Sequence, residues 1–497
     1  MRIRRARLLP RSVPAPPGRW RGLPLPLADP AQRGPLIGWL GVGLALRFAL
    51  MPFTISSDLL AVYWRSHLIA YHGRLFGEYL VNMGAHYVHA ASLRLLGLLL
   101  PPPEVLWTHP WWWADSSALA PQIQREFSTQ PWTYETLFAL KIPYLLADLG
   151  AGLILLALLG RMVAPASVRR AWVFWMLSPI GLYASYVFGR YEMFPVVLVL
   201  GALLACERDR PWFGAVLLGL AITMRTYPLL LVPVFALIVM RRRSVTALTL
   251  AQAAWAAVAL APFGLIMGMN RLLAGSVGEL GRLKDFSTGS TLLAYAIPVD
   301  GPGQVYLFVL FAALVYGALL GRAYGWWGRG RVPVEQLWVW LLVFHLGMFA
   351  FATFSAHYLA WLTPFIALAI ARRPAWRGIL PLHLLQCGVV LAFADLIGGS
   401  AIMVGLFQPL EPDLATAWPN LQEAFLTSPR LGAHLAGALR TGFIALALLL
   451  TVPAIAELAG RVTPPPQPRH RERHRPPEQP QPAEREPQLV VEQPRAG

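Results

Sequence analysis

Charged residues and cysteines are both scarce in this sequence of 497 residues, and each scarcity excludes a class of protein. Asp, Glu, Lys and Arg make up 13% of the chain, about half their share in soluble domains, while hydrophobic residues reach 56%. This composition excludes an ordinary soluble domain, and it excludes a disordered chain, which needs low hydrophobicity and high charge. Two cysteines are too few for a disulfide scaffold. The abundant apolar residues instead predict an all-α, polytopic integral membrane protein.

Lysine is nearly absent, since Lys141 and Lys284 are the only lysines among 42 basic residues. A formal net charge of +17 would suggest nucleic acid as the partner of a soluble protein. In a membrane protein, however, positive charge gathers in cytoplasmic loops. We therefore attribute the excess to membrane insertion, and we expect membrane lipids and no nucleic acid as partners.

Apolar runs near the length of about 20 residues that crosses a bilayer recur along the chain and predict about 12 transmembrane helices. They occupy approximately residues 35–53, 136–160, 171–188, 193–205, 212–224, 227–240, 245–267, 304–320, 335–353, 358–371, 378–405 and 437–459.

The long segment at residues 54–135 is expected to form a first extracytoplasmic loop with juxtamembrane helices. It contains one more apolar stretch, Tyr79 to Leu100. If this stretch does not cross, every later arginine cluster and both termini lie on the cytoplasmic side, whereas a crossing would place those clusters outside. We expect a helix buried against protein there. The resulting organisation is a disordered basic arm (1–34), a transmembrane domain (35–460) and a disordered cytoplasmic tail rich in Pro, Arg and Glu (461–497).

Polar residues that interrupt the apolar background gather at the predicted outer face. Asp58 follows the first span and is placed to accept a proton from a hydroxyl, although Ser57 or Asp58 could equally cap a helix that starts at Leu59. Arg190 and Glu192 lie at an outer turn, where they either pair only with each other or contribute to a site.

Further candidates lie at later outer turns. Arg225, followed by Tyr227, could bind phosphate or merely extend its side chain to the interface. His357, followed by Tyr358, is either a substrate contact or a buried histidine with local partners. Arg282 and Lys284 lie in an outer loop that could hold a lipid headgroup or be solvated. No metal-binding, Walker or dinucleotide motif is found in the sequence.

The order of these features resembles the multi-spanning glycosyltransferases of the GT-C fold, in particular bacterial relatives of the glycosylphosphatidylinositol mannosyltransferases. That family has an acidic residue after the first span, followed by K-x-P-x-x-x-A-D, N-P, G-Q-x-D, G-L-A-x-x-x-K-x-Y-P and S-P-Q-Y-L-x-W-x-x-P. The corresponding residues here are Asp58, Lys141 to Asp148, Ser178 to Pro179, Gly189 to Glu192, Gly219 to Pro228 and Ser355 to Pro364. Arg190, Glu192 and His357 depart from the family pattern.

The resemblance implies transfer of a sugar, mannose or another hexose, with inversion. The donor would be a polyprenyl-phosphate sugar and the acceptor a hydroxyl of a glycan, lipid or protein at the outer face of a bacterial inner membrane. Asp58 would be the general base, and the candidate cations would stabilise the departing phosphate. No cofactor is certain, and a divalent metal is left open. The alternatives are a transporter or flippase of a lipid-linked sugar and a glycan ligase or polymerase.

Overall fold

The computed structural model describes the chain at residues 25–77, 82–102, 105, 120–241, 244–276, 292–299, 303–326, 331–353, 355–372, 378–398, 407–413 and 429–459. The chain divides into two units, Met1–Val462 and Thr463–Gly497, of which the second lies outside the described residues. The described part is almost entirely helical, as expected of an all-α membrane protein.

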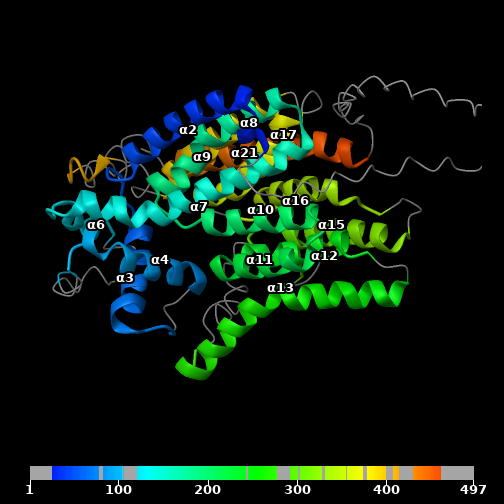
Figure 1. Ribbon diagram of the computed structural model, residues 1–497, viewed down its shortest axis with the longest axis horizontal. Coiled ribbons are helices and arrows are strands. Elements are labelled where there is room, and N and C mark those ends of the chain that lie inside the picture. The colour runs from blue at the N-terminus through cyan, green and yellow to red at the C-terminus, as the bar shows by residue number, and fades with distance from the viewer. Residues whose placement is uncertain are drawn as a thin grey trace, which may run out of the picture. The chain divides into compact units, whose positions relative to one another are not determined.

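Helices account for nearly every predicted apolar run (Figure 1). They are α1 (Leu25–Ala28), α2 (Pro30–Leu50), α3 (Ser57–His72), α4 (Met83–Leu95), η1 (Gly97–Leu99), α6 (Ala120–Ser128), α7 (Thr133–Met162), α8 (Pro165–Leu177), α9 (Pro179–Leu182), η4 (Tyr183–Val187), α10 (Met193–Glu207), α11 (Pro211–Met224), η5 (Tyr227–Leu231), α12 (Val232–Val239), α13 (Val245–Ala274), α15 (Leu307–Tyr324), η7 (Val334–Gln336), α16 (Leu337–Phe351), η8 (Ala356–Leu362), α17 (Thr363–Ala371), α18 (Ile379–Gly398) and α21 (Pro429–Leu458).

Five described helical segments are long and apolar enough to cross a membrane: Thr133–Met162, Val245–Ala274, Leu307–Tyr324, Val334–Phe351 and Leu431–Leu458. Five shorter apolar helices of 10–17 residues accompany them. The protein is therefore a helical membrane protein, while the expected count of 12 spans stays a prediction.

The first long helix, α2, begins earlier than the sequence suggested. Asp29 is its N-cap and accepts a hydrogen bond of 3.1 Å from the backbone N–H of Ala31, and Pro30 occupies the first helical position. Residues 30–34, assigned from the sequence to a disordered arm, are therefore helical. The sequence placed the end of the disordered arm too late, because the helix-start signal of Asp29 and Pro30 is weaker than the apolar run that follows it.

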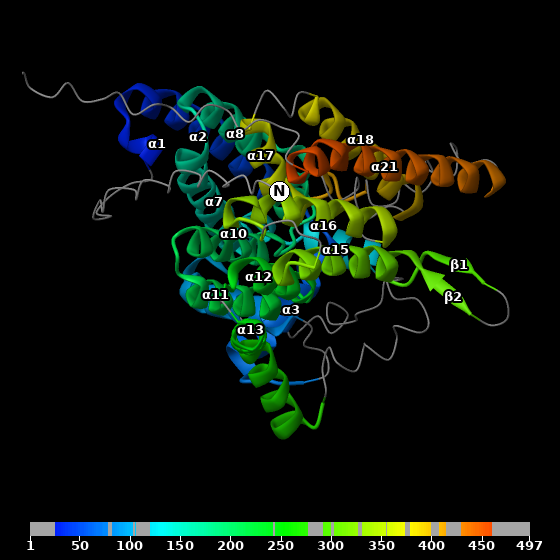
Figure 2. The same ribbon diagram turned by 90° about the vertical axis from the view of Figure 1, so that its right-hand side faces the viewer.

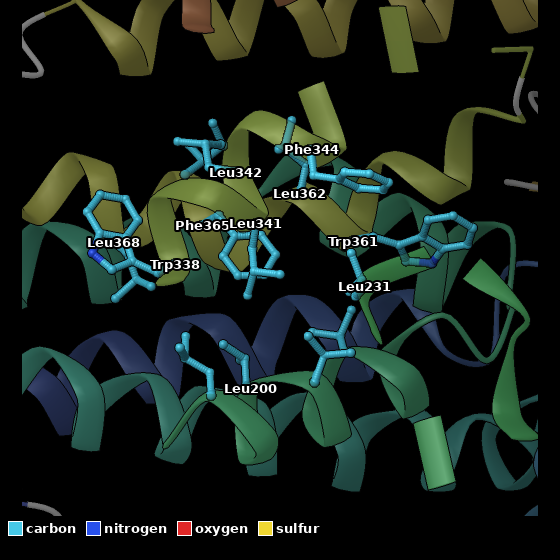
Figure 3. Packing of buried hydrophobic residues seen from close by; sticks show 14 of the residues in the cluster. Leu200, Leu231, Trp338, Leu341, Leu342, Phe344, Trp361, Leu362, Phe365 and Leu368 are labelled. Atoms are coloured by element: carbon cyan, nitrogen blue, oxygen red, sulfur yellow. The ribbon is translucent and has the colours of Figure 1, made fainter. Parts of the chain in front are cut away.

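The larger hydrophobic core surrounds α16, whose side chains are buried on every side from Leu337 to Ala350. A helix that is apolar all round belongs in the centre of a bundle. Figure 3 shows Trp338 and Phe344 of α16, Phe365 of α17 and Leu200 of α10 among the side chains of this core.

A second core joins α3, α4 and α6 to the first half of α7 (Figure 1). Its α4 has 13 residues and a length of about 20 Å, less than a hydrocarbon core of about 30 Å. Gly84 lets α4 approach α11 closely, because a Cβ there would lie 2.5 Å from Thr223 Oγ1. The described part of Tyr79 to Leu100 thus consists of α4, which packs against protein and is by itself too short to cross, followed by the exposed short helix η1.

The described residues also include two strands that the sequence pattern does not predict. β1 (Ala296–Pro298) and β2 (Gln304–Tyr306) pair antiparallel with Ile297 opposite Val305, in the segment preceding α15 (Figure 2). A strand of three residues shows too little alternation to be recognised in sequence.

Candidate active site

Four segments that are distant in sequence meet around one group of charged and aromatic side chains. They are the first turn of α3 with Asp58, the turn between η4 and α10 with Arg190 and Glu192, the C-terminal end of α11 with Arg225, and η8 with His357. The structure therefore unites five of the residues that the sequence singled out.

Asp58 and Arg190 form an ion pair, with 2.8 Å between Asp58 Oδ1 and Arg190 Nη1. The Asp58 side chain is 36% exposed, whereas that of Arg190 is 12% exposed. The N-cap of α3 is Ser56, whose Oγ accepts a hydrogen bond of 3.1 Å from Leu59 N. The alternative that Ser57 or Asp58 caps this helix is therefore wrong: capping needs extended backbone, which here belongs to Ser56.

Arg190 follows a glycine whose backbone conformation makes the turn possible. Gly189 has φ +68°, in the left-handed region that favours glycine. The Arg190 guanidinium carbon lies 5.0 Å from the ring centre of Tyr191, a cation–π distance. Burial lowers the pKa of Arg190, but the neighbouring Tyr191 and Asp58 raise it by more, so that it lies above its ordinary value. The guanidinium is therefore a permanent positive charge.

Glu192 pairs with Arg225 and not with Arg190. Its carboxylate is fully buried and accepts hydrogen bonds from Arg225 Nε (3.1 Å) and from Trp361 Nε1 (2.6 Å). The alternative that Arg190 and Glu192 pair only with each other is therefore wrong, because the packing of α11 and η8 against this turn supplies other partners for Glu192.

Arg225 does not extend to the interface, because its residue exposure is 8% and its guanidinium is engaged by Glu192. The guanidinium carbon also lies 5.0 Å from the ring centre of Tyr191 and 4.7 Å from that of Tyr358. The Arg225 guanidinium therefore packs against two aromatic rings and a buried carboxylate.

An aromatic stack extends from this cation. The Trp361 ring stacks on Tyr227 at 3.7 Å and on Tyr358 at 4.7 Å between ring centroids. Tyr227 and Tyr358 were candidates from the sequence, whereas Trp361 was not, although it lies in a motif quoted above. The hydrogen bond from the Trp361 indole N–H to the buried Glu192 carboxylate cannot be predicted from residue spacing.

His357 lies under the same group, with its ring stacked on Phe188 at 4.3 Å. Its Nε2 is 3.7 Å from Glu192 Oε1, too far for a hydrogen bond. Within the described residues, His357 Nε2 and Arg190 Nε are buried and make no hydrogen bond. Arg190 Nη1 is likewise buried and makes no hydrogen bond within the described part of the chain, although it lies 2.8 Å from Asp58 Oδ1.

Two ionisable residues of α7 have structural partners. Lys141 donates to backbone carbonyls of the α2–α3 connection, and Asp148 pairs with Arg47 at 2.7 Å while accepting a hydrogen bond of 2.8 Å from the hydroxyl of Tyr186. Arg282 and Lys284 lie outside the described residues. Across the described ranges, no group of three or more His, Cys, Asp or Glu residues could hold a metal.

Comparison with known proteins gives one match. Residues 130–346 match the sequence profile of Glycosyltransferase family 87. This range includes Arg190, Glu192 and Arg225, and it excludes Asp58 and His357. No curated protein and no solved structure matches the chain. The resemblance to glycosylphosphatidylinositol mannosyltransferases is not confirmed. The family match, together with the apolar helices, supports a membrane glycosyltransferase of the GT-C type.

Proposed function

We propose that this protein transfers a sugar, mannose or another hexose, from a polyprenyl-phosphate carrier to an acceptor hydroxyl. The reaction would take place at the outer face of a bacterial inner membrane, with inversion at the anomeric carbon. The observation that carries the proposal is the contrast between the two carboxylates of the site: Asp58 is 36% exposed, whereas Glu192 is fully buried. Only Asp58 of this pair can reach a hydroxyl that arrives from outside.

In this reaction Asp58 is the general base. It accepts the proton of the acceptor hydroxyl as the hydroxyl oxygen bonds to the anomeric carbon. The bond between that carbon and the phosphate oxygen breaks in the same step, and the lipid phosphate leaves with the electron pair. A single displacement of this kind inverts the anomeric centre.

The departing phosphate gains negative charge and needs hydrogen-bond donors that are already in place. Arg190 Nε and His357 Nε2 are buried nitrogens without a hydrogen bond in the described part of the chain. Arg190 also carries a permanent charge, and its contact with Asp58 places the leaving-group site beside the base. We therefore assign Arg190 and His357 to the phosphate, and Arg225 to the packing that supports them.

The reaction as proposed uses no divalent metal. Asp58 pairs with Arg190, and Glu192 pairs with Arg225 and Trp361. The aromatic side chains of Tyr227 and Tyr358 extend this group through their stacking on Trp361.

The test uses purified protein in proteoliposomes that contain polyprenyl-phosphate donors with a labelled sugar moiety. The proposal predicts equal amounts of sugar on the acceptor and of free polyprenyl phosphate. Movement of intact donor between leaflets without cleavage would instead indicate a flippase, and the proposal would then be wrong.

A further inference from the structure

Lys141 is a buried cation that the proposed reaction does not use. It lies in α7, is 0% exposed, and directs its ammonium group at the chain that leaves α2. Nζ donates hydrogen bonds to Met51 O (2.8 Å), Thr54 O (2.6 Å) and Thr54 Oγ1. An ammonium group has three donors, so these acceptors satisfy all of them. Lys141 thus fixes the segment that connects α2 to α3.

The same segment is joined to the turn that carries Arg190. The hydroxyl of Thr54 contacts Tyr186 O, and the hydroxyl of Ser56 donates to Phe188 O at 2.5 Å. Ser56 is also the N-cap of α3. Two side chains therefore tie the start of the Asp58 helix to the end of η4.

At Gly189, the turn that carries Arg190 packs closely against Lys141. A Cβ at Gly189 would lie 3.4 Å from Lys141 Cε, 3.1 Å from Leu59 Cδ2 and 3.3 Å from Leu59 Cβ. The turn that carries Arg190 consequently rests on the aliphatic part of Lys141 and on the first turn of α3. The Lys141 side chain therefore contacts both the segment that leads to Asp58 and the turn that carries Arg190.

We propose that Lys141 is a positioning residue, which sets the distance between the Asp58 carboxylate and the Arg190 guanidinium by fixing the α2–α3 connection against the η4 turn. This inference rests on the proposed function, since it gives the ion pair a role in transfer. Without the three hydrogen bonds, the connection can move relative to the turn. A displacement of about 1 Å in reacting groups can cost about 100-fold in rate without preventing binding.

The first variant is Lys141→Met, which keeps the aliphatic chain and removes the donors. Thr54→Val removes one acceptor and the contact to Tyr186, and Thr54→Ser restores the hydroxyl. The matched control is Thr249→Val in α13, which removes a hydroxyl that donates to Val245 O (3.1 Å) and meets Tyr324 Oη (2.7 Å) away from the site.

We expect Lys141→Met and Thr54→Val to lower kcat about 10- to 100-fold, with KM for donor and acceptor changed less than about twofold. Thr54→Ser should recover most of kcat, and Thr249→Val should keep it. If Lys141→Met does not fold, the comparison of kcat between Thr54→Val and Thr54→Ser tests the positioning role. A kcat of Thr54→Val equal to that of Thr249→Val, or a full kcat of Lys141→Met, overturns the positioning role. Absence of transfer by the unmodified protein instead contradicts the proposed function.

Discussion

Glu192 and Arg225 form a two-point ion pair inside the protein: Arg225 Nε lies 3.1 Å and Nη2 2.5 Å from the same carboxylate oxygen. The pair connects the beginning of α10 to the end of α11, and Trp361 Nε1 brings η8 to it. Because opposite charges meet there, Arg225 presents little net charge to a substrate. The neighbouring Arg190 pairs instead with Asp58, whose side chain is 36% exposed.

Glu192→Gln should destabilise the protein strongly, because it leaves the buried guanidinium of Arg225 without a countercharge. Removing one partner of a buried ion pair costs about 3–5 kcal/mol. The comparison is Asp413→Asn, which breaks an exposed pair with Arg125 whose side chains are 51% and 65% exposed, and which should cost about 1 kcal/mol or less. Thermal unfolding in detergent measures both. Equal shifts in Tm for the two variants would show that the ion pair between Glu192 and Arg225 does not stabilise the fold more than an exposed pair does.

Gly189→Ala should lower both stability and transfer. The left-handed backbone costs a residue with a Cβ about 1–2 kcal/mol, and the new methyl would press on Leu59, 3.1 Å away at its nearest atom. Gly264→Ala in α13 is the matched control, since a Cβ there meets nothing within 4 Å. Chemical or thermal unfolding of the two variants, together with their transfer rates, checks this. A Gly189→Ala protein as stable and active as Gly264→Ala would contradict the turn geometry.

Arg190→Gln should reduce kcat/KM for the donor about 100-fold or more, because one preorganised donor to a developing charge contributes about 10²–10³ in rate. Arg94→Gln controls for loss of a cation over a ring: Arg94 lies 4.7 Å from the Tyr71 ring centre and donates to Ala70 O at 2.7 Å. That control should keep the wild-type rate. Donor kinetics that are the same for Arg190→Gln and Arg94→Gln would remove Arg190 from the phosphate site.

Orientation in the membrane can be tested with cysteines at two exposed positions. Arg74 precedes α4 in the predicted outer loop, and Arg210 lies between α10 and α11 in a predicted inner loop. An impermeant thiol reagent should label Arg74→Cys in intact cells and Arg210→Cys only after permeabilisation. The native Cys206 and Cys387 are buried and should give little background. The reverse labelling pattern would invert the proposed topology.

The sequence predicted helices well and side-chain partners poorly, for one physical reason. Apolar runs such as Met193 to Ala205 determine a helix locally, and α10 indeed begins at Met193. The partner of Arg190, by contrast, lies 132 residues away at Asp58, and depends on how α3 packs on the η4 turn. Spacing therefore suggested Glu192, the nearest acid.

Motif order identified segments that meet in the structure, but not the contacts that each of their residues makes. Lys141 falls in a motif next to the site, yet two of its three acceptors are backbone carbonyls, which carry no sequence signal, and the third is the hydroxyl of Thr54, far away in sequence. Ser56 likewise became visible as the cap of α3 only from the backbone geometry.

The central claim is that Asp58 is the base of a sugar transfer, and single-turnover transfer from a polyprenyl-phosphate sugar by purified Asp58→Asn tests it most directly. The matched control is Asp29→Asn, which changes another aspartate at a helix N-terminus, the cap of α2, where asparagine caps equally well. We predict that Asp58→Asn still folds and binds the donor while its transfer rate falls by about 10²–10⁴-fold, and that Asp29→Asn transfers normally. Transfer by Asp58→Asn at the rate of Asp29→Asn would contradict the account.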